Sequence, residues 1–419
     1  MIAPAAHLLI WAIALLATAG VIVRPFGWPE AVWAMAGAVL VVTLGLLPVP
    51  GATQAMAKGT DVYLFLVGMM LLSETARRLG LFDAVAARAV NLAGGSSRRL
   101  FILIYAVGVV VTVFLSNDAT AVVLTPAVYA AARHAKADPL PHLFACALIA
   151  NAASFVLPIS NPANLVLYAD QTPVLFDWLA RFGPPSILSI GATFAVLRWS
   201  QRRALGAACE AQVEVPRLTA GGWTALAGIT VTAVALSVVS ARGWPLGLAT
   251  FILGVLTTAL ALIAARASPW PVLKGVSWSV PPLVAGLFIL VEAVGRTGAI
   301  AQLAMVLQAA IHGSQTGAAA GAGLLIAFAC NLMNNLPAGL VASAVLAQAH
   351  APRPVVDALL IGVDLGPNLS ITGSLATILW LTALRREGQS VSFWRFFKLG
   401  LLVMPPALVA ALGARLVMG

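Results

Sequence analysis

The sequence predicts an all-α protein that crosses a membrane several times and is built from two inverted repeats. Three observations predict this class: the apolar composition, recurring apolar runs of membrane-spanning length, and four motifs that return in the same order. Of the 419 residues, 61% are hydrophobic and 9% are charged. A soluble core of this length could not bury so much apolar surface. An apolar run of about 20 residues crosses a bilayer as one helix.

The charges and cysteines exclude several other classes of function. The formal net charge is +10, but the basic residues fall mostly in short segments between apolar runs. This distribution is typical of membrane topology, so we expect no nucleic-acid partner. Cys146, Cys209 and Cys330 have neither disulfide nor zinc-site spacing. We therefore expect no metal, no cofactor and no enzymatic activity.

Four motifs of the first half recur in the second half at offsets of 213 to 218 residues. Four matches in the same order at nearly one offset indicate a duplicated chain. We predict a first repeat at 1–199, a cytoplasmic linker at 200–220 and a second repeat at 221–419. The matched pairs are GWP at 27–29 and 243–245, ETARRLG at 74–80 and EAVGRTG at 292–298, SNDATA at 116–121 and MNNLPA at 333–338, and NAASFVLPISNPAN at 151–164 and DLGPNLSITGSLAT at 364–377.

Each repeat is predicted to contain five transmembrane helices, of which the fourth is broken, and one re-entrant hairpin. The segment 82–99 is amphipathic and is expected at the membrane interface. The segment 100–134 is too long for one crossing and is interrupted by polar residues, so we predict a hairpin with arms of about 15 residues, or about 22 Å. The second hairpin is predicted at 316–348 and the second broken helix at 355–383. The crossings of the first repeat are expected at about 7–23, 31–47, 61–80, 142–169 and 183–198.

An odd number of crossings per repeat makes the second repeat inverted relative to the first, as in many secondary transporters. With the linker in the cytoplasm, three quarters of the 24 Lys and Arg residues lie inside, as the positive-inside rule requires. This orientation puts both termini outside. It predicts a bacterial-type inner (plasma) membrane protein whose first hairpin opens to the cytoplasm and whose second opens outward.

Polar residues gather at the hairpin tips and at the breaks in the two broken helices. Non-helical backbone at membrane depth is tolerated only where protein or water covers it, and its free groups can bind a ligand. We expect the tip of each hairpin to meet the broken helix of its own repeat. The predicted substrate-binding residues are Ser116, Asn117, Asn151, Asn161, Asn164, Asn334, Asn335, Asn368, Ser374 and Thr377.

Asp118 and Asp364 are the predicted proton-coupling residues. In the repeat alignment Asp118 stands opposite Asn335, and Asp364 stands opposite Asn151. The hairpin tip and broken helix of each repeat, here called a half-site, therefore contain one carboxyl group. A buried carboxylate without a basic partner is costly, so each aspartate should stay neutral until water or a cation reaches it. The alternatives are that the aspartates cap half-helices and that the asparagines satisfy broken backbone.

Four other acidic residues are expected to have structural roles. Glu74 and Glu292 each precede an arginine by four residues, Arg78 and Arg296, which is the spacing of an intrahelical ion pair. Asp61 and Asp357 begin predicted spans and are expected at the membrane interface.

Two stretches resemble a known family. The stretch IGVDLGPNLSITGSLATILWLTALRREG at 361–388 is similar to the C-terminal signature of the ArsB-type arsenite permeases, and SNDATAVVLTPAV at 116–128 resembles their first-half motif. The resemblance covers most of the chain and implies membership of the ion-transporter superfamily, which shares two hairpins and two broken helices. Its carboxylate carriers have Ser-Asn-Thr at both tips, whereas this chain has Ser116-Asn117-Asp118 and Met333-Asn334-Asn335.

The resemblance implies export of arsenite and antimonite from the cytoplasm, driven by inward movement of protons, with an optional cytoplasmic ATPase partner. Arsenite at neutral pH is mainly an uncharged trihydroxide that donates and accepts hydrogen bonds, as asparagine side chains do. The alternatives are a sodium/proton antiporter and a dicarboxylate or citrate carrier. A carboxylate carrier would need a cationic clamp, and the four polar motifs contain no Lys or Arg.

Overall fold

The computed structural model describes residues 4–169 and 172–419, and within these ranges the chain is helical and forms no β-strand. Short 3-10 turns interrupt it at 25–27, 158–160, 204–206, 366–369 and 371–373, and 120–124 is a π-helix. The α-helices are α1 (Pro4–Val23), α2 (Glu30–Thr43), α3 (Val49–Lys58), α4 (Thr60–Arg78), α5 (Leu81–Ala93), α6 (Ser97–Leu115), α7 (Asn117–Ala119), α8 (Thr125–His134), α9 (Pro139–Ala152), α10 (Pro162–Tyr168), α11 (Leu175–Ser200), α12 (Ala220–Ala241), α13 (Leu246–Ala265), α14 (Trp270–Gly275), α15 (Val280–Gly295), α16 (Ala299–Gly313), α17 (Gln315–Met333), α18 (Asn335–Ala349), α19 (Arg353–Leu365), α20 (Leu375–Arg386) and α21 (Phe393–Val417).

Six of the described helices are long and apolar enough to cross a membrane, and two bent pairs raise this number to eight. The pairs are α3 with α4, bent by 49°, and α15 with α16, bent by 76°. The long helices expose leucine, valine and tryptophan side chains outward, as lipid contact requires. The predicted class, an all-α polytopic membrane protein, is confirmed.

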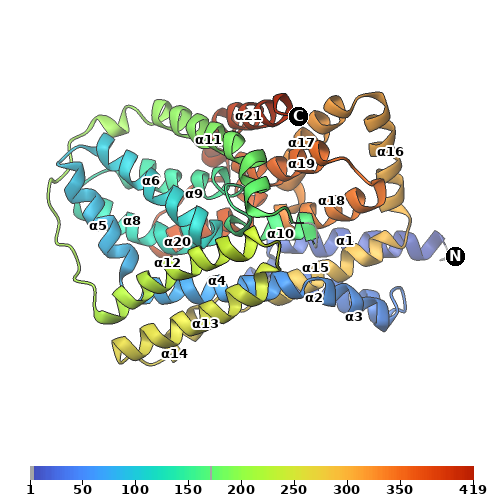
Figure 1. Ribbon diagram of the computed structural model, residues 1–419, viewed down its shortest axis with the longest axis horizontal. Helices are drawn as coiled ribbons and strands as arrows, with labels where there is room; N and C mark the ends of the chain where they lie inside the picture. Colours follow the sequence, from blue (N-terminus) through green and yellow to red (C-terminus); the bar gives the residue numbers. More distant parts are fainter. Residues whose placement is uncertain (1–3, 170–171) are drawn as a thin grey trace.

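The helices form two layers (Figure 1). One layer, here called the scaffold, contains α1 to α4 and α12 to α15. The other, here called the core, contains α5 to α11 and α16 to α21. Within the scaffold, α4 packs against α12 and α13 of the second half, and α15 packs against α1 and α2 of the first. The third span of each half, α4 in the first and α15 in the second, belongs to the scaffold because it packs on helices of the opposite half.

The crossing of α4 and α13 shows how closely the scaffold helices approach. A Cβ atom on Gly68 would lie 2.4 Å from the carbonyl oxygen of Thr250, and one on Gly254 would lie 2.5 Å from the carbonyl oxygen of Gly68. Two backbones can come this near in a membrane only where both helices lack side chains at the contact. Glycines at this crossing therefore allow the two halves of the scaffold to pack closely.

Both hairpins form, but their first arms are longer than we expected. The chain reverses at Ser116 (φ 94°) between α6 and α7–α8, and at Asn334 (φ 74°) between α17 and α18. The arms α6 and α17 each have 19 residues, or about 28 Å of helix, so the predicted length of about 15 residues is wrong for them. The amphipathic helices α5 and α16 each pack on both arms of the adjacent hairpin.

The linker between the two halves lies on the base of the first hairpin. The amide of Cys209 donates to the carbonyl of Gly95 at 3.1 Å, and that of Glu210 donates to Ala135 at 2.7 Å. Lys136 forms an ion pair with Glu210 at 2.8 Å, and this hydrogen bond lowers the pKa of the Glu210 carboxyl. The order of helices is the same on both sides of this linker, in keeping with the predicted repeat boundaries, which stay a prediction.

Candidate functional site

The first broken helix consists of α9 and α10, separated by residues 153–161. Pro158 and Pro162 prevent a continuous helix because proline lacks the amide that an interior helical position needs. Asn161 caps α10: its side-chain oxygen accepts a hydrogen bond from the amide of Ala163 at 3.0 Å. The positive end of the α10 dipole therefore points into the break.

The second broken helix, α19 and α20, repeats this arrangement. Gly366 and Pro367 end α19, and Ser374 caps α20 by accepting from the amide of Thr377 at 3.1 Å. In the repeat alignment Ser374 stands opposite Asn161, so equivalent residues cap the two second half-helices. Asn151 and Asp364, which are also equivalent, lie at the ends of the two first half-helices.

The two breaks are joined by hydrogen bonds that asparagines of the first repeat donate to the second. Asn151 donates through Nδ2 to Oδ1 of Asn368 at 3.0 Å and to the hydroxyl of Thr377 at 3.3 Å. Asn161 donates through Nδ2 to Oδ1 of Asp364 at 2.5 Å. We expected two separate half-sites. The breaks instead share one set of buried polar side chains, here called the central cluster: Asn151, Asn161, Asn164, Asp364, Asn368, Ser374 and Thr377. Asn151 and Asn161 bond residues of the second repeat, whereas Asn164 bonds the backbone of its own break.

Three acceptor atoms of the central cluster have no hydrogen-bond partner. They are Oδ1 of Asn151, Oδ1 of Asn164 and Oδ2 of Asp364, and all three are buried. The amide of Asn164 instead donates to the carbonyl of Ser154 at 2.9 Å, so half of this side chain satisfies broken backbone. A buried acceptor without a donor costs about 1–3 kcal/mol. A ligand that donates hydrogen bonds, or a cation, would satisfy acceptors of this kind.

The hairpin tips do not join this cluster by hydrogen bonds in the described part of the chain. Oδ1 of Asn117 accepts from the amide of Asp118 at 2.9 Å, and Oδ1 of Asn334 accepts from Leu336 at 3.3 Å, so both asparagines stabilise the turns. Ser116 and Asn335 are buried at the tips. Asp118 lines a small cavity between the core and the scaffold, beside Glu74.

The first arm of each hairpin is attached to the break of its own repeat. Ser160 donates to the carbonyl of Val113 on α6 at 3.0 Å. Asn331 on α17 donates to the carbonyl of Gly366 at 3.0 Å and accepts from the hydroxyl of Ser370 at 2.7 Å. Asn331 was missed by the sequence analysis, although an asparagine within the apolar run 316–333 was a signal that could have found it.

The expected intrahelical ion pairs form. Glu74 binds Arg78 at 2.8 Å and also Arg77 at 2.5 Å, and Glu292 lies 3.8 Å from Arg296 and 3.1 Å from Lys58. Asp61 accepts from the amide of Gly247 at 2.8 Å. In the described residues, no group of three or more His, Cys, Asp or Glu side chains could hold a metal ion.

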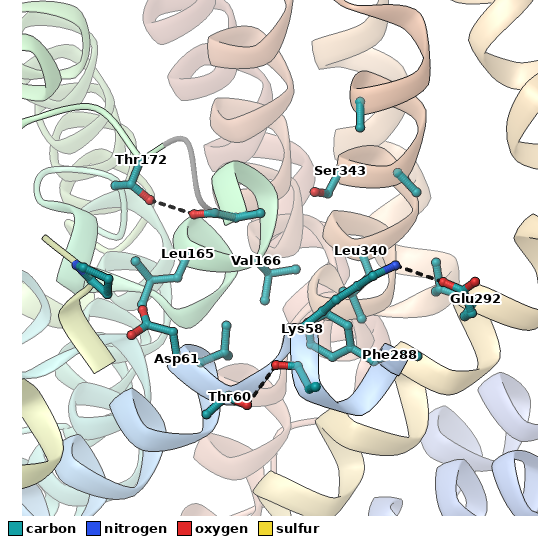
Figure 2. Close-up of a pocket in the computed structure, with 18 of the residues that line it drawn as sticks. Lys58, Thr60, Asp61, Leu165, Val166, Thr172, Phe288, Glu292, Leu340 and Ser343 are labelled. Carbon is teal, nitrogen blue, oxygen red and sulfur yellow. Dashed lines mark hydrogen bonds and ion pairs between the residues drawn. The ribbon is translucent and has the colours of Figure 1, made fainter. Parts of the chain in front are cut away.

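Two cavities lie between the core and the scaffold, and their walls are equivalent in the repeat alignment. The larger one, of about 980 Å³, is lined by Glu292 of α15, Leu340 of α18 and Val166 of α10 (Figure 2). The smaller one, of about 50 Å³, is lined by the three repeat counterparts Glu74, Val123 and Leu379. The repeat-equivalent walls are thus apart around the larger cavity and close together around the smaller one.

Two layers, two hairpins and two joined broken helices define a polytopic membrane transporter. The sequence matches the family model CitMHS, described as citrate transporter, over residues 8–362, and the chain belongs to this family.

Among curated proteins, the chain is 27% identical to the arsenical pump membrane protein of Yersinia enterocolitica over 405 residues, which cover 93% of this chain and 92% of that protein. It is 27% identical to the arsenical pump membrane protein of Escherichia coli (strain K12) over 407 residues, with the same coverage. The ArsB-type resemblance is therefore confirmed.

Two solved structures share the fold. The YdaH transporter of Alcanivorax borkumensis superimposes with a TM-score of 0.58 at 17% identity, covering 99% of this chain and 98% of that chain. MtrF of Neisseria gonorrhoeae superimposes with a TM-score of 0.54 at 13% identity, covering 99% and 95%. These likenesses concern the fold alone.

Proposed function

We propose that this transporter exports trivalent arsenic and antimony, as neutral trihydroxides, from the cytoplasm in exchange for protons. The observation that carries the proposal is the set of three unpartnered buried acceptors on Asn151, Asn164 and Asp364. A metalloid trihydroxide carries three O–H groups, which can donate hydrogen bonds to acceptors of this kind. The arsenical pump names of the relatives agree with this chemistry.

The two unequal cavities support transport by alternating access. In the proposed orientation, the large cavity beside Lys58 and Arg296 opens to the outside, and the small cavity beside Glu74 faces the cytoplasm. The structure then corresponds to the outward-open state. Opening the small cavity and closing the large one would interchange the conformations of the two equivalent surfaces, as inverted repeats permit.

Asp364 and Asp118 are the proposed proton carriers. Asp364 is buried with one free carboxylate oxygen, and Asp118 lines the closed cavity. A proton on Asp364 would convert that oxygen from an acceptor to a donor, so proton and metalloid compete for one atom. Exchanging a neutral solute for a proton moves net charge, to which the membrane potential contributes about 2.3 kcal/mol per 100 mV. The same proposal places the protein in a bacterial-type inner membrane with both termini outside. It also includes a cytoplasmic ATPase as an optional partner.

Two alternatives each have one observation in their favour. The family description favours a carboxylate substrate, but Lys and Arg are absent from the four polar motifs, so a carboxylate would meet no cation there. The free acceptors would also suit a sodium ion, as in a sodium/proton antiporter.

Arsenite uptake into everted vesicles tests the proposal. The vesicles receive an imposed pH gradient, acid inside, with sodium absent. Uptake that follows the gradient supports metalloid/proton exchange. Uptake that requires sodium favours the antiporter, and uptake of citrate in place of arsenite favours the carboxylate carrier.

Cysteine accessibility should report the unequal cavities. Leu340→Cys and Val123→Cys are repeat counterparts that line the large and the small cavity, respectively. Both variants are made in a background without Cys209, the partly exposed native thiol. We expect a membrane-impermeant maleimide to label Leu340→Cys from the outside about tenfold faster than it labels Val123→Cys from the cytoplasmic side. The reason is that an alternative state of a two-state protein is often populated at only ~0.1–10%. Faster labelling of Val123→Cys from the cytoplasmic side would mean that the inward-open state dominates.

A further inference from the structure

Asp357 on α19 is the centre of a buried charge network outside the central cluster. Its side chain is fully buried by protein, and its expected place at the membrane interface stays a prediction. Nε of Arg415 donates to Oδ2 at 2.7 Å, and Nη1 of Arg181 lies 3.7 Å from Oδ1. The hydroxyl of Tyr168 donates to the same Oδ1. The network joins α10, α11, α19 and α21.

The Tyr168–Asp357 bond lies in register with the Asn161–Asp364 bond. Tyr168 follows Asn161 by seven residues, and Asp357 precedes Asp364 by seven residues, so α10 and α19 run antiparallel with two matching contacts. Seven residues are two helical turns, or about 10 Å. The second contact therefore determines how α10 slides and rotates against α19, and hence where the amide of Asn161 lies relative to the Asp364 carboxylate.

The opposite pair of half-helices, α9 and α20, carries no such charge. In the repeat alignment Phe144 stands opposite Asp357, and it packs on Trp380 with ring centroids 5.8 Å apart. The indole of Trp380 donates to the carbonyl of Leu143 at 3.0 Å. The ionic contact is thus present only in the pair of half-helices that contains Asp364.

We propose that Tyr168 and Asp357 are positioning residues that set the Asn161–Asp364 contact and thereby the proton affinity of Asp364. This inference rests on the proposed proton coupling at Asp364. Arg415 and Arg181 hold the Asp357 carboxylate still, and Tyr168 transmits its position to α10.

Few other titratable groups face Asp364. From α17 the thiol of Cys330 lies beside it, donating to the carbonyl of Val363 at 3.9 Å. On α9, Cys146 lies against Thr125, and His142 contacts the carbonyl of Asp138. The described residues of α18 include no titratable side chain, and the other ones on α10, α19 and α21 are Tyr168, Arg353, Asp357, Arg395, Lys398 and Arg415. The hydroxyl of Ser154 also acts on the Asp364 carboxyl, and the amide of Asn161 is the group beside it whose placement depends on α10.

Tyr168→Phe tests the proposal with little risk to folding. It removes one hydroxyl, while Asp357 keeps both arginines, so no buried charge loses its partner. Arsenite uptake into everted vesicles is measured over a series of pH values at a constant imposed gradient. Weakening the amide contact disfavours the Asp364 anion, so half-maximal uptake should move toward alkaline pH by about 0.5–1 unit.

Trp380→Phe is the matched control. It removes one donor from the half-helix pair that lacks Asp364, and we expect the pH profile of the unmodified protein. A displaced profile in Tyr168→Phe alone supports the proposal, whereas unchanged or equally displaced profiles in the two variants overturn it. If Asp364→Asn itself keeps gradient-driven uptake, the proposed coupling at Asp364 fails first, and the two failures are distinguished.

Asp357→Asn gives a second, stronger variant. It leaves the buried Arg415 and the partly buried Arg181 without a carboxylate, so we expect less folded protein in the membrane. In the protein that does fold, the pH profile should move in the same direction as in Tyr168→Phe. A shift in the opposite direction would contradict the positioning role.

Discussion

Replacing Asp364 with asparagine should reduce gradient-driven arsenite uptake to the level of vesicles without the protein. Asparagine has nearly the same shape and can still accept from Asn161, so the central cluster should fold as before. It cannot bind and release a proton, however, and an intramembrane carboxyl group in a secondary transporter is the usual carrier of one. The measurement is uptake at fixed pH gradient, together with the amount of folded protein in the membrane.

Glu292→Gln is the matched control for this experiment. Glu292 also lies between core and scaffold, but it is partly exposed and already paired with Lys58 and Arg296. Loss of an exposed ion pair changes stability by about 0–1 kcal/mol, so uptake should remain close to that of the unmodified protein. Asp118→Asn, at the closed cavity, should lose uptake as Asp364→Asn does. Full uptake in Asp364→Asn would exclude Asp364 as the proton carrier and move the coupling to Asp118.

Replacing Gly366 with alanine should destabilise the core and abolish transport. A Cβ atom at this position would lie 2.2 Å from the carbonyl oxygen and 2.5 Å from the Cα of Ala327, both backbone atoms of α17. The first arm of the second hairpin would have to move away from the break, which weakens the bond from Asn331 to Gly366. Overpacking of this kind costs about 1–3 kcal/mol. Thermal unfolding in detergent should show a lower midpoint.

Gly191→Ala provides the comparison, because no atom lies within 4 Å of a Cβ atom built at Gly191 in α11. Alanine favours a helix by up to about 1 kcal/mol over glycine, so the midpoint should stay the same or rise. Equal midpoints for the two variants would show that α17 and the break can separate at little cost. The close packing of hairpin and break would then not explain why glycine occupies position 366.

The elements of the candidate site were predictable from local patterns. Ser116 and Asn334 interrupt apolar runs, so both hairpin turns were found within a residue. Pro158, Pro162 and Pro367 identified the breaks, because proline forbids a helical interior regardless of what surrounds it. The arm lengths were underestimated because helix ends such as Ser97 carry weaker local signals than helix interruptions.

The partners of each side chain were not predictable in this way. Nothing in the local sequence states that Asn151 binds Thr377 or that Asn161 binds Asp364, because each bond crosses between the repeats. Asp357 was predicted only as a residue at the start of a span, and its burial depends on Arg415 and Arg181, which come from two other helices.

The sequence by itself determined that this chain spans a membrane as a duplicated transporter with two hairpins and two broken helices. Composition, apolar run length and helix-breaking residues act locally, so they can be recognised without coordinates. Only the tertiary structure decided that the two breaks form one central cluster, that α4 and α15 each pack on scaffold helices of the opposite half, and that equivalent cavities differ in volume. These features depend on contacts between residues some 200 positions apart, which are set by packing in three dimensions.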